Sequence, residues 1–201
     1  MICYIVGAGE FHGEFTPSSD DLVIAADGGY DALISHGYRC DVLIGDFDSI
    51  SALPQGIELI RYNKRKDYTD TYLCYLEGVK RGYSEFVILG GTGGRDDHTF
   101  ANLSLIALAK NEGHNVTLLS ERYKISALKS EERVLRSTSG KALSVFAFGS
   151  EARGVTIRGA EYECEDVTLS PLFPLGVSNA FLNLPVTLSV NEGILLVMEE
   201  I

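Results

Sequence analysis

Hydrophobic and polar positions follow different patterns in the two parts of this 201-residue chain. In the first part, short apolar runs alternate with segments whose apolar residues recur at helical spacing, and this alternation is typical of a parallel sheet. The predicted strands are residues 2–6, 22–26, 42–44, 58–60, 86–89 and 116–119, and the predicted helices are residues 30–36, 69–81 and 97–112. Gly37, Gly82 and Gly113 follow these helices, at the position where glycine commonly ends a helix.

After Ser120 the pattern changes to short β-rich runs separated by Gly, Ser, Asn or Pro. Helical periodicity is almost absent there, which favours an antiparallel sandwich or barrel. The predicted strands in this part are residues 125–129, 132–135, 143–148, 155–158, 187–190 and 194–198. We therefore predict an α/β domain with a parallel sheet over residues 1–122, followed by an all-β, sandwich-like domain over residues 123–201.

Charge and cysteine usage narrow the class of protein. A formal net charge of −11, with no basic stripe to offset it, argues against a nucleic-acid partner or an anionic membrane surface. Cys3, Cys40, Cys74 and Cys164 are isolated in sequence, which suits a reducing cytoplasm rather than a disulfide framework. No cleavable leader or membrane-spanning run is apparent, so we expect a cytoplasmic protein.

Gly45-Asp46-Phe47-Asp48-Ser49 follows the apolar run 42–44, with one acid on either side of an aromatic residue. Ligands of open α/β sheets bind outside the carboxyl ends of the strands, so both carboxylates would face the site. Close carboxylates repel each other unless a cation lies between them, and a hard ion such as Mg²⁺, which usually accompanies phosphates, suits oxygen ligands. The alternative is a turn with two solvated acids. The motif alone does not decide between them.

Asp67 and Asp70 stand at the start of the second predicted helix. Their spacing of three puts both carboxylates on one side of the first turn, near the positive end of the helix dipole. One interpretation is a helix cap, with Asp67 as the N-cap and Asp70 as its acidic partner. The other is a metal site, and the two are compatible because Asp70 can cap weakly and still reach an ion.

Residues 90–94, Gly-Gly-Thr-Gly-Gly, join the predicted strand 86–89 to the predicted helix 97–112. A glycine-rich loop between a strand and a helix is the arrangement that presents backbone N–H groups to a phosphate. Arg95 adds a planar guanidinium suited to a phosphate oxygen or a carboxylate. The sequence contains no P-loop pattern, and Gly7-Ala8-Gly9 lacks the third glycine of a dinucleotide fingerprint, so we interpret that segment as a turn.

Four short motifs stand in a fixed order along the chain: Asp27-Gly28-Gly29, Gly45-Asp46-Phe47-Asp48-Ser49, Asp67-x-x-Asp70 and Gly93-Gly94-Arg95-x-Asp97-His98. In this order they resemble the thiamine pyrophosphokinase family, and the resemblance extends to Ser178-Asn179. It implies an ATP-binding α/β catalytic domain followed by a thiamine-binding β-sandwich. It also implies a thiamine diphosphokinase, which transfers a diphosphate group from ATP to the hydroxyl of thiamine and leaves AMP, and a homodimer with sites shared between subunits.

The resemblance implies roles for individual residues. Asp46, Asp48 and Asp70 are expected to hold Mg²⁺, and Asp67 is expected to position or deprotonate the thiamine hydroxyl. Arg95 would cradle the triphosphate, and Asp97 would orient Arg95 or a metal-bound water. The residues expected to bind the nucleotide are Asp27, Gly28, Gly29, Gly90, Gly91, Thr92, Gly93, Gly94 and His98.

Ser178 and Asn179 depend on the resemblance entirely. Their spacing alone indicates a turn, because Ser-Asn is a common turn pair. Only the resemblance makes them expected contacts of thiamine.

Two other functions are compatible with the sequence. A metal-dependent nucleotide-sugar transferase would use Asp46 and Asp48 to hold a metal against a nucleotide diphosphate, but this explains neither the glycine loop with Arg95 nor the β domain. A non-catalytic thiamine- or nucleotide-binding regulator would be expected to lack some of the acids, and none is missing here. Attack at the β- rather than the γ-phosphorus is implied by the resemblance alone.

Overall fold

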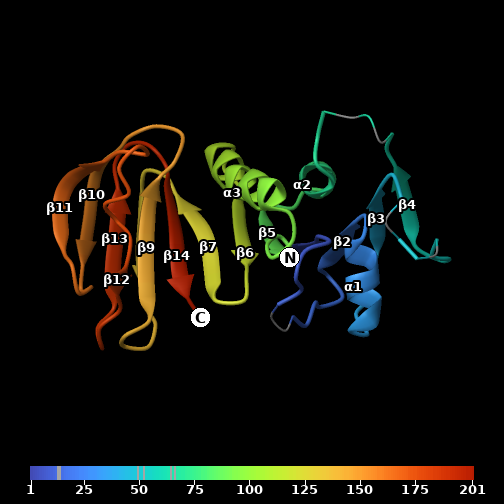
Figure 1. Ribbon diagram of the computed structural model, residues 1–201, viewed down its shortest axis with the longest axis horizontal. Coiled ribbons are helices and arrows are strands. Elements are labelled where there is room, and N and C mark those ends of the chain that lie inside the picture. Colours follow the sequence, from blue (N-terminus) through green and yellow to red (C-terminus); the bar gives the residue numbers. More distant parts are fainter. Residues whose placement is uncertain (13–14, 49, 52, 64, 66) are drawn as a thin grey trace. The chain divides into compact units, whose positions relative to one another are not determined.

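The computed structural model describes residues 1–12, 15–48, 50–51, 53–63, 65 and 67–201 (Figure 1). Ser49, the last residue of the motif Gly45-Asp46-Phe47-Asp48-Ser49, therefore lies outside the described residues. The chain divides into two compact units, Met1–Leu105 with His114–Glu121 and Ile106–Gly113 with Arg122–Ile201. The predicted fold class, a mostly parallel α/β sheet followed by a β-sandwich, is confirmed.

The first unit is built on parallel strands in the order β6-β5-β1-β2-β3-β4. Their bounds are β1 (Cys3–Val6), β2 (Leu22–Ala26), β3 (Val42–Gly45), β4 (Glu58–Arg61), β5 (Glu85–Leu89) and β6 (Asn115–Leu119). The chain runs outwards from β1 to β4 on one side and from β5 to β6 on the other, so the direction of winding reverses between β1 and β5. Open α/β sheets bind their ligands at such a switch point.

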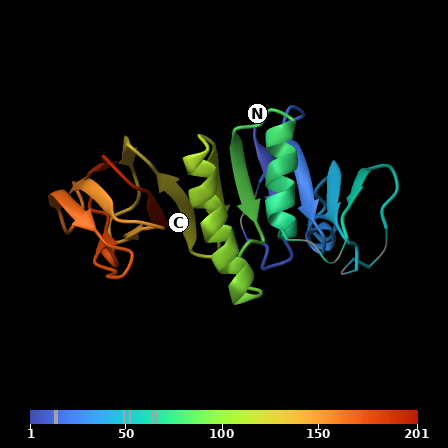
Figure 2. The same cartoon turned by 90° about the horizontal axis from the view of Figure 1, so that it is seen from above.

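Helices α1 (Gly29–Ser35) and α2 (Asp70–Lys80) cover opposite faces of this sheet (Figure 2). Leu33 of α1 packs in one apolar cluster with Val23. On α2, the ring of Tyr75 lies 5.0 Å from that of Phe86. Phe86 is paired with Cys3 of β1, and Val23 is paired with the next residue of that strand, Tyr4. Successive residues of a strand point to opposite faces of the sheet, so α1 and α2 lie on different faces.

The third helix, α3 (Asp96–Asn111), follows the glycine loop. The predicted helix stops are confirmed, because Gly37, Gly82 and Gly113 have φ angles of 74°, 88° and 88°. None of the helices in the described part of the chain has the length and apolar character that a membrane span needs.

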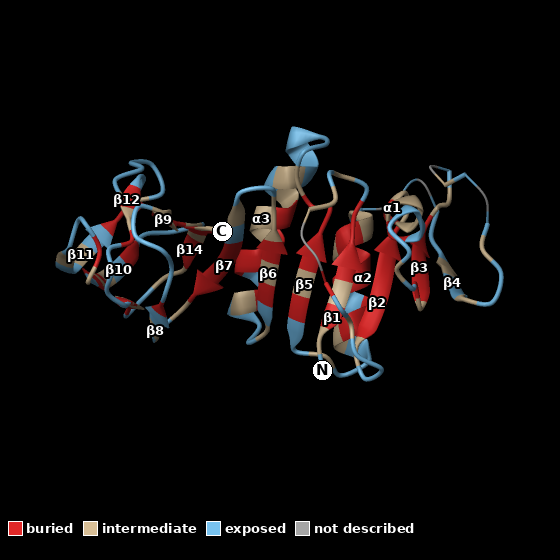
Figure 3. Ribbon diagram, turned by 90° about the horizontal axis from the view of Figure 1, so that it is seen from below, coloured by how far each residue is buried: buried red, intermediate tan, exposed pale blue. Residues whose placement is uncertain are grey.

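Burial explains why the central strands read as continuous apolar runs. Every residue of β2 and β3 is buried, whereas the edge strand β4 is largely exposed (Figure 3). A parallel sheet with both faces covered requires apolar side chains at successive positions, not only at alternate ones.

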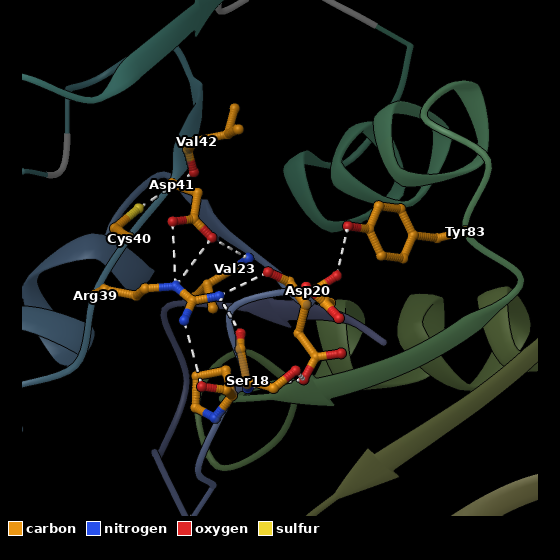
Figure 4. Close-up of polar contacts among 10 residues, drawn as sticks. Ser18, Asp20, Val23, Arg39, Cys40, Asp41, Val42 and Tyr83 are labelled. Carbon is orange, nitrogen blue, oxygen red and sulfur yellow. Dashed lines mark hydrogen bonds and ion pairs between the residues drawn. The ribbon is translucent and has the colours of Figure 1, made fainter. Parts of the chain in front are cut away.

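Arg39 ties together the amino ends of β2 and β3, at the edge opposite the strands' carboxyl ends (Figure 4). Its Nη2 donates to the carbonyl oxygens of Ser18 and Asp21 at 2.8 and 2.6 Å, and its Nε donates to Asp41 Oδ1 at 3.2 Å. Asp41 Oδ2 in turn accepts a hydrogen bond of 2.8 Å from the amide of Val23. A planar guanidinium can serve several acceptors at once, so one side chain sets the start of two strands.

The second unit contains two antiparallel sheets, ordered β12-β9-β14-β7 and β11-β10-β13-β8. Their strands are β7 (Tyr123–Leu128), β8 (Glu131–Leu135), β9 (Ala142–Ala147), β10 (Ala152–Arg158), β11 (Cys164–Leu169), β12 (Asn179–Ala180), β13 (Val186–Val190) and β14 (Leu195–Glu200). Buried side chains from both sheets, including Val145 and Val197 from one and Val155 and Leu188 from the other, form a common core. This is the arrangement of a sandwich.

β11 and β12 are not among the strands predicted from the sequence. The register of β11 shifts against β10, and Asp166 within it has a φ of 53°, so its apolar residues do not alternate regularly. β12 is only the pair Asn179–Ala180, which is too short to produce a period.

Candidate active site

A cavity of about 560 Å³ lies at the carboxyl ends of β1, β2, β3 and β5, and we call it the strand-end cavity. It collects residues from segments that are far apart in the sequence. Its lining residues are Gly7, Ala8, Gly9, Ala26, Asp27, Asp46, Asp48, Asp70, Thr71, Gly90, Gly91, Thr92, Gly94, Arg95, His98, Thr99 and Asn102. The predicted metal ligands Asp46, Asp48 and Asp70 and most of the predicted phosphate loop are thus brought to one place.

Three carboxylates form a cluster on one side of this cavity. One oxygen from each of Asp27, Asp46 and Asp48 lies within 4.8 Å of the others. Asp46 and Asp48 are expected from the sequence to bind a metal and Asp27 to bind the nucleotide, but in the structure Asp27 lies beside the other two. Three negative charges so close together repel one another unless a cation is shared, and hard divalent ions take carboxylate oxygens.

The backbone around this cluster has unusual conformations. Asp27 and Phe47 have φ angles of 44° and 68°, in the left-handed region that side chains other than glycine rarely adopt. A Cβ on Gly45 would lie 2.9 Å from Asp27 Cβ, so only glycine lets β3 pass this close. Phe47 packs against the apolar core next to α1, which turns the two flanking acids outwards.

The two acids at the start of α2 occupy different environments. Asp70 is the first residue of the helix, is half-buried and lines the strand-end cavity. The N-cap is Thr69, whose Oγ1 accepts the amide of Tyr72 at 3.2 Å. The interpretation of Asp67 as the helix cap is therefore wrong. Asp67 is exposed and is not among the described residues that line the cavity.

Two glycine segments pair with each other on the other side of the cavity. The bonds run from Gly7 N to Leu89 O at 2.8 Å, from Gly9 N to Gly90 O at 2.9 Å and from Glu10 N to Thr92 O at 2.8 Å. A Cβ on Gly7 would lie 2.6 Å from the Gly90 carbonyl oxygen, which explains the glycine at this position. The interpretation of Gly7-Ala8-Gly9 as a simple turn was incomplete, because these residues support the glycine loop and line the cavity.

Arg95 is held by Asp97 through two parallel hydrogen bonds. Nη2 donates to Oδ2 at 2.6 Å and Nε donates to Oδ1 at 3.1 Å. This bidentate contact raises the pKa of Arg95 and lowers the pKa of Asp97. Arg95 and His98 line the cavity, whereas Asp97 acts on it through Arg95.

Three of the glycines expected to bind the nucleotide, Gly28, Gly29 and Gly93, are not among the described lining residues. A Cβ on Gly29 would collide with the Val6 carbonyl oxygen, so this glycine lets α1 approach β1 closely. Gly93 has a φ of 77° and lies against the side chain of Glu10. The observed role of Gly29 is to allow close backbone approach, and that of Gly93 is to allow a turn.

Ser178 and Asn179 belong to the second unit. Asn179 is buried, and its side-chain amide binds the backbone of Tyr162 on both sides, with Nδ2 donating to the carbonyl at 2.7 Å and Oδ1 accepting the amide at 2.9 Å. It also lines a mainly apolar cavity of about 400 Å³ together with Leu175 and Val177. Ser178 is exposed and has a φ of 61°. Contact of these two residues with a substrate stays a prediction.

Comparisons with known proteins agree on one family. The family model described as "Thiamin pyrophosphokinase, catalytic domain" matches residues 16–118, and that described as "Thiamin pyrophosphokinase, vitamin B1 binding domain" matches residues 122–195. A thiamine pyrophosphokinase of Bacillus subtilis (strain 168) is 26% identical over 184 residues, which cover 88% of this chain and 86% of that protein.

Solved structures share the fold. The crystal structure of thiamine pyrophosphokinase from Bacillus subtilis superimposes with a TM-score of 0.90 at 22% identity, covering 100% of this chain and 99% of that one. Thiamin pyrophosphokinase from Candida albicans gives a TM-score of 0.77 at 16% identity, covering 100% of this chain and 89% of that one. With the two family models spanning both units, this chain belongs to the thiamin pyrophosphokinase family.

Proposed function

We propose that this protein is a thiamine diphosphokinase, which transfers a diphosphate group from ATP to the hydroxyl of thiamine and releases AMP. One observation carries the proposal beyond family membership. A single cavity at the switch point of the sheet has a carboxylate cluster on one side and a glycine loop with Arg95 on the other. This pairing suits a metal-bound polyphosphate, because the acids hold the cation while the loop and the guanidinium contact the phosphate oxygens.

The donor set fits Mg²⁺. Asp27, Asp46 and Asp48 offer carboxylate oxygens within 4.8 Å of one another, and Asp70 lines the same cavity from α2. We propose that Asp46, Asp48 and Asp70 hold the ion as expected, and that Asp27 joins them. When bound, Mg²⁺ neutralises negative charge that develops on the phosphate oxygens during transfer.

The phosphate side consists of groups that bind and orient an anion. The backbone amides of the glycine loop, most of which lines the cavity, offer N–H donors, and His98 and Thr99 of α3 line the cavity beside this loop. Arg95 adds a guanidinium whose plane is set by Asp97, so less conformational freedom is lost when a phosphate binds. These groups would orient the triphosphate for in-line attack on the β-phosphorus.

Asp67 is the proposed group that positions or deprotonates the thiamine hydroxyl. Its carboxylate does not cap α2, because Thr69 occupies that position, so helix formation does not account for it. It is exposed, three residues before the helix begins. A carboxylate near the start of α2 can accept a hydroxyl proton as the oxygen attacks.

Thiamine binding is assigned to the β part of the chain. We propose residues 1–122 as the ATP-binding catalytic domain and residues 123–201 as the thiamine-binding domain, with Ser178 and Asn179 as substrate contacts. We further propose a homodimer in which these residues of one subunit complete the site of the other. In support, the loop before Ser178 exposes large apolar side chains, including Leu172 at 93% and Phe173 at 65%. Such a patch is typical of a contact surface.

The test is to incubate the purified protein with ATP, Mg²⁺ and thiamine, and to separate the products by chromatography. Thiamine diphosphate and AMP in equal amounts are expected. ADP as the sole nucleotide product would overturn diphosphate transfer and indicate an ordinary kinase, and no turnover with intact binding would indicate a regulator. A parallel incubation replaces ATP by a nucleotide sugar, and turnover there, with thiamine left unchanged by ATP, would favour the sugar transferase instead.

A further inference from the structure

Protein donors hold the carbonyl groups at the start of the glycine loop. The carbonyls of Leu89, Gly90 and Thr92 accept hydrogen bonds from residues 7–10, as described above. The fourth carbonyl in this run, that of Gly91, accepts a hydrogen bond of 2.8 Å from Nδ2 of Asn102. Four successive carbonyls are therefore held by protein donors, three by backbone amides and one by a side chain.

This has a direct consequence for the loop amides. In a trans peptide the C=O and the following N–H point in opposite directions, and this chain has no cis peptide bond among its described residues. With the carbonyls of residues 89–92 held, the N–H groups of residues 90–93 point away from those donors. Within the described part of the chain, no acceptor for these four amides is found. Gly90, Gly91 and Thr92 line the strand-end cavity, so their amides are available to an anion that binds at this loop.

Asn102 is placed to control one of these peptides. It lies on α3, is 4% exposed and lines the cavity. Gly91 is closely packed, since a Cβ there would lie 2.9 Å from Ile88 Cγ2 and 3.2 Å from Asn102 Nδ2. A buried side-chain amide next to a phosphate loop is costly unless it is hydrogen-bonded, and here it bonds to the loop itself.

We propose that Asn102 is a positioning residue for polyphosphate binding. Its amide holds the Gly91 carbonyl and so keeps the N–H of Thr92 turned towards the cavity. Without this donor, the Gly91–Thr92 peptide is free to rotate and to present a carbonyl oxygen where a phosphate oxygen should bind. The proposal deepens the function proposed above and rests on it for the identity of the nucleotide.

The test compares Asn102→Leu, which has similar volume but no donor, with the wild-type protein. Inorganic tripolyphosphate and Mg²⁺-ATP are titrated calorimetrically, and KM values for ATP and thiamine are measured. We expect the Kd for tripolyphosphate and the KM for ATP to rise about tenfold, the effect of one lost hydrogen bond to a charged group. The KM for thiamine should stay within about twofold. Asn111→Leu is the matched control, because it makes the same change at an exposed position of the same helix.

The readouts separate a positioning role from damage to the fold. Partial unfolding would lower the number of binding sites and kcat but leave the Kd of the remaining sites unchanged, and that result would overturn the proposal. An unchanged Kd in a fully folded Asn102→Leu protein would also overturn it. Because tripolyphosphate binding needs no thiamine, a wild-type protein that binds it but does not use thiamine would defeat the proposed reaction and leave the Asn102 comparison valid.

A measurement on the wild-type protein covers the case in which the variant does not fold. In ¹⁵N-labelled protein, the amide signals of residues 90–93 should shift when tripolyphosphate is added, while that of Gly140, in the second unit, should not. A Thr92 amide that does not respond while binding occurs would overturn the proposal.

Discussion

The Phe47 amide donates a 3.1 Å hydrogen bond to Oδ1 of Asp27, across the carboxyl ends of two neighbouring strands. Both residues have left-handed φ angles, 44° for Asp27 and 68° for Phe47. Such conformations cost roughly 1–3 kcal/mol each and persist only where the surrounding structure imposes them. These strained conformations occur where Asp27 and Asp46 lie close together, so the backbone preorganises the carboxylate cluster.

Replacing Asp46 by Asn should abolish most turnover without weakening the fold. Asn retains an oxygen that can accept the Asp48 amide but removes one charge from the cluster. We expect kcat to fall about 100-fold or more, since the metal loses a charged ligand. The melting temperature without Mg²⁺ should not fall, because repulsion among like charges is relieved. Asp20→Asn removes an exposed carboxylate before β2 and serves as the control. Wild-type activity in Asp46→Asn would contradict the metal assignment.

Gly45→Ala should damage the same cluster by steric means. The added Cβ would lie 2.9 Å from Asp27 Cβ and 3.0 Å from its Oδ1, so Asp27 must move. We expect a loss of about 1–3 kcal/mol in the free energy of unfolding, together with reduced turnover. In Gly94→Ala the new Cβ meets Gly9 Cα at 3.5 Å, an ordinary contact, so stability should change by less than about 0.5 kcal/mol. Urea unfolding of both variants measures the difference; equal losses would refute the steric argument.

Arg39→Lys should lower stability and leave catalysis unchanged. A lysine ammonium cannot contact the Ser18 and Asp21 carbonyls and the Asp41 carboxylate in the fork geometry that Arg39 uses. We expect a loss of about 1–2 kcal/mol in the free energy of unfolding, with kcat and KM unaltered because these contacts lie at the amino ends of the strands. The same change at Arg136, which is exposed in the second unit, is the control. A change in KM would show that the two edges of the sheet are coupled.

Asp21 should contribute to acid sensitivity. Its pKa is lowered, first by the amide of Ile2 and then by the amide and hydroxyl of Ser18, all of which donate to its carboxylate. A depressed folded-state pKa means that this stabilisation is complete above the unfolded-state pKa, about 3.9, and is lost as the pH falls through the folded value. The stability gap between wild type and Asp21→Asn should therefore be largest near neutral pH and should close in acid. Denaturant unfolding from pH 7 to pH 3 measures it, and a constant gap would contradict the assignment.

Mixed dimers should test the shared site. Asp46→Asn lacks a metal ligand, and Asn179→Ala lacks the amide that binds the Tyr162 backbone, so each variant alone should be inactive or nearly so. After subunit exchange, about half of the sites in a mixed dimer would combine the two unaltered parts, and activity should return in part. Native mass spectrometry confirms the exchange. Exchange without recovery would mean that each site is built within one chain.

Local patterns predicted most of the elements but not all of the site. Asp46, Asp48 and the glycine loop were found because each follows an apolar run and has a composition suited to its chemistry. Asn102 carries no such signal, because within its helix it reads as one polar residue among apolar neighbours. One interpretation of the sequence made Asp67 the cap of α2, although Thr69, also a good capping residue, occupies that position. Which of two nearby capping residues is the N-cap depends on the backbone angles, and the sequence pattern does not give those angles.

The sequence by itself determined the strands and helices of the first unit, the change to β structure after Ser120, and the presence of metal-type acids and a phosphate-type loop. These features follow from the periodicity of apolar side chains and from the backbone conformations that glycine allows. Both are local properties that extend over a few residues. The tertiary structure alone decided which strand ends are neighbours. It brought Asp27 to Asp46 and Asp48, Gly7 and Gly9 to the glycine loop, and Asn102 to Gly91. These contacts depend on the order of strands in the sheet, which is set by the packing of the whole unit and not by any local period.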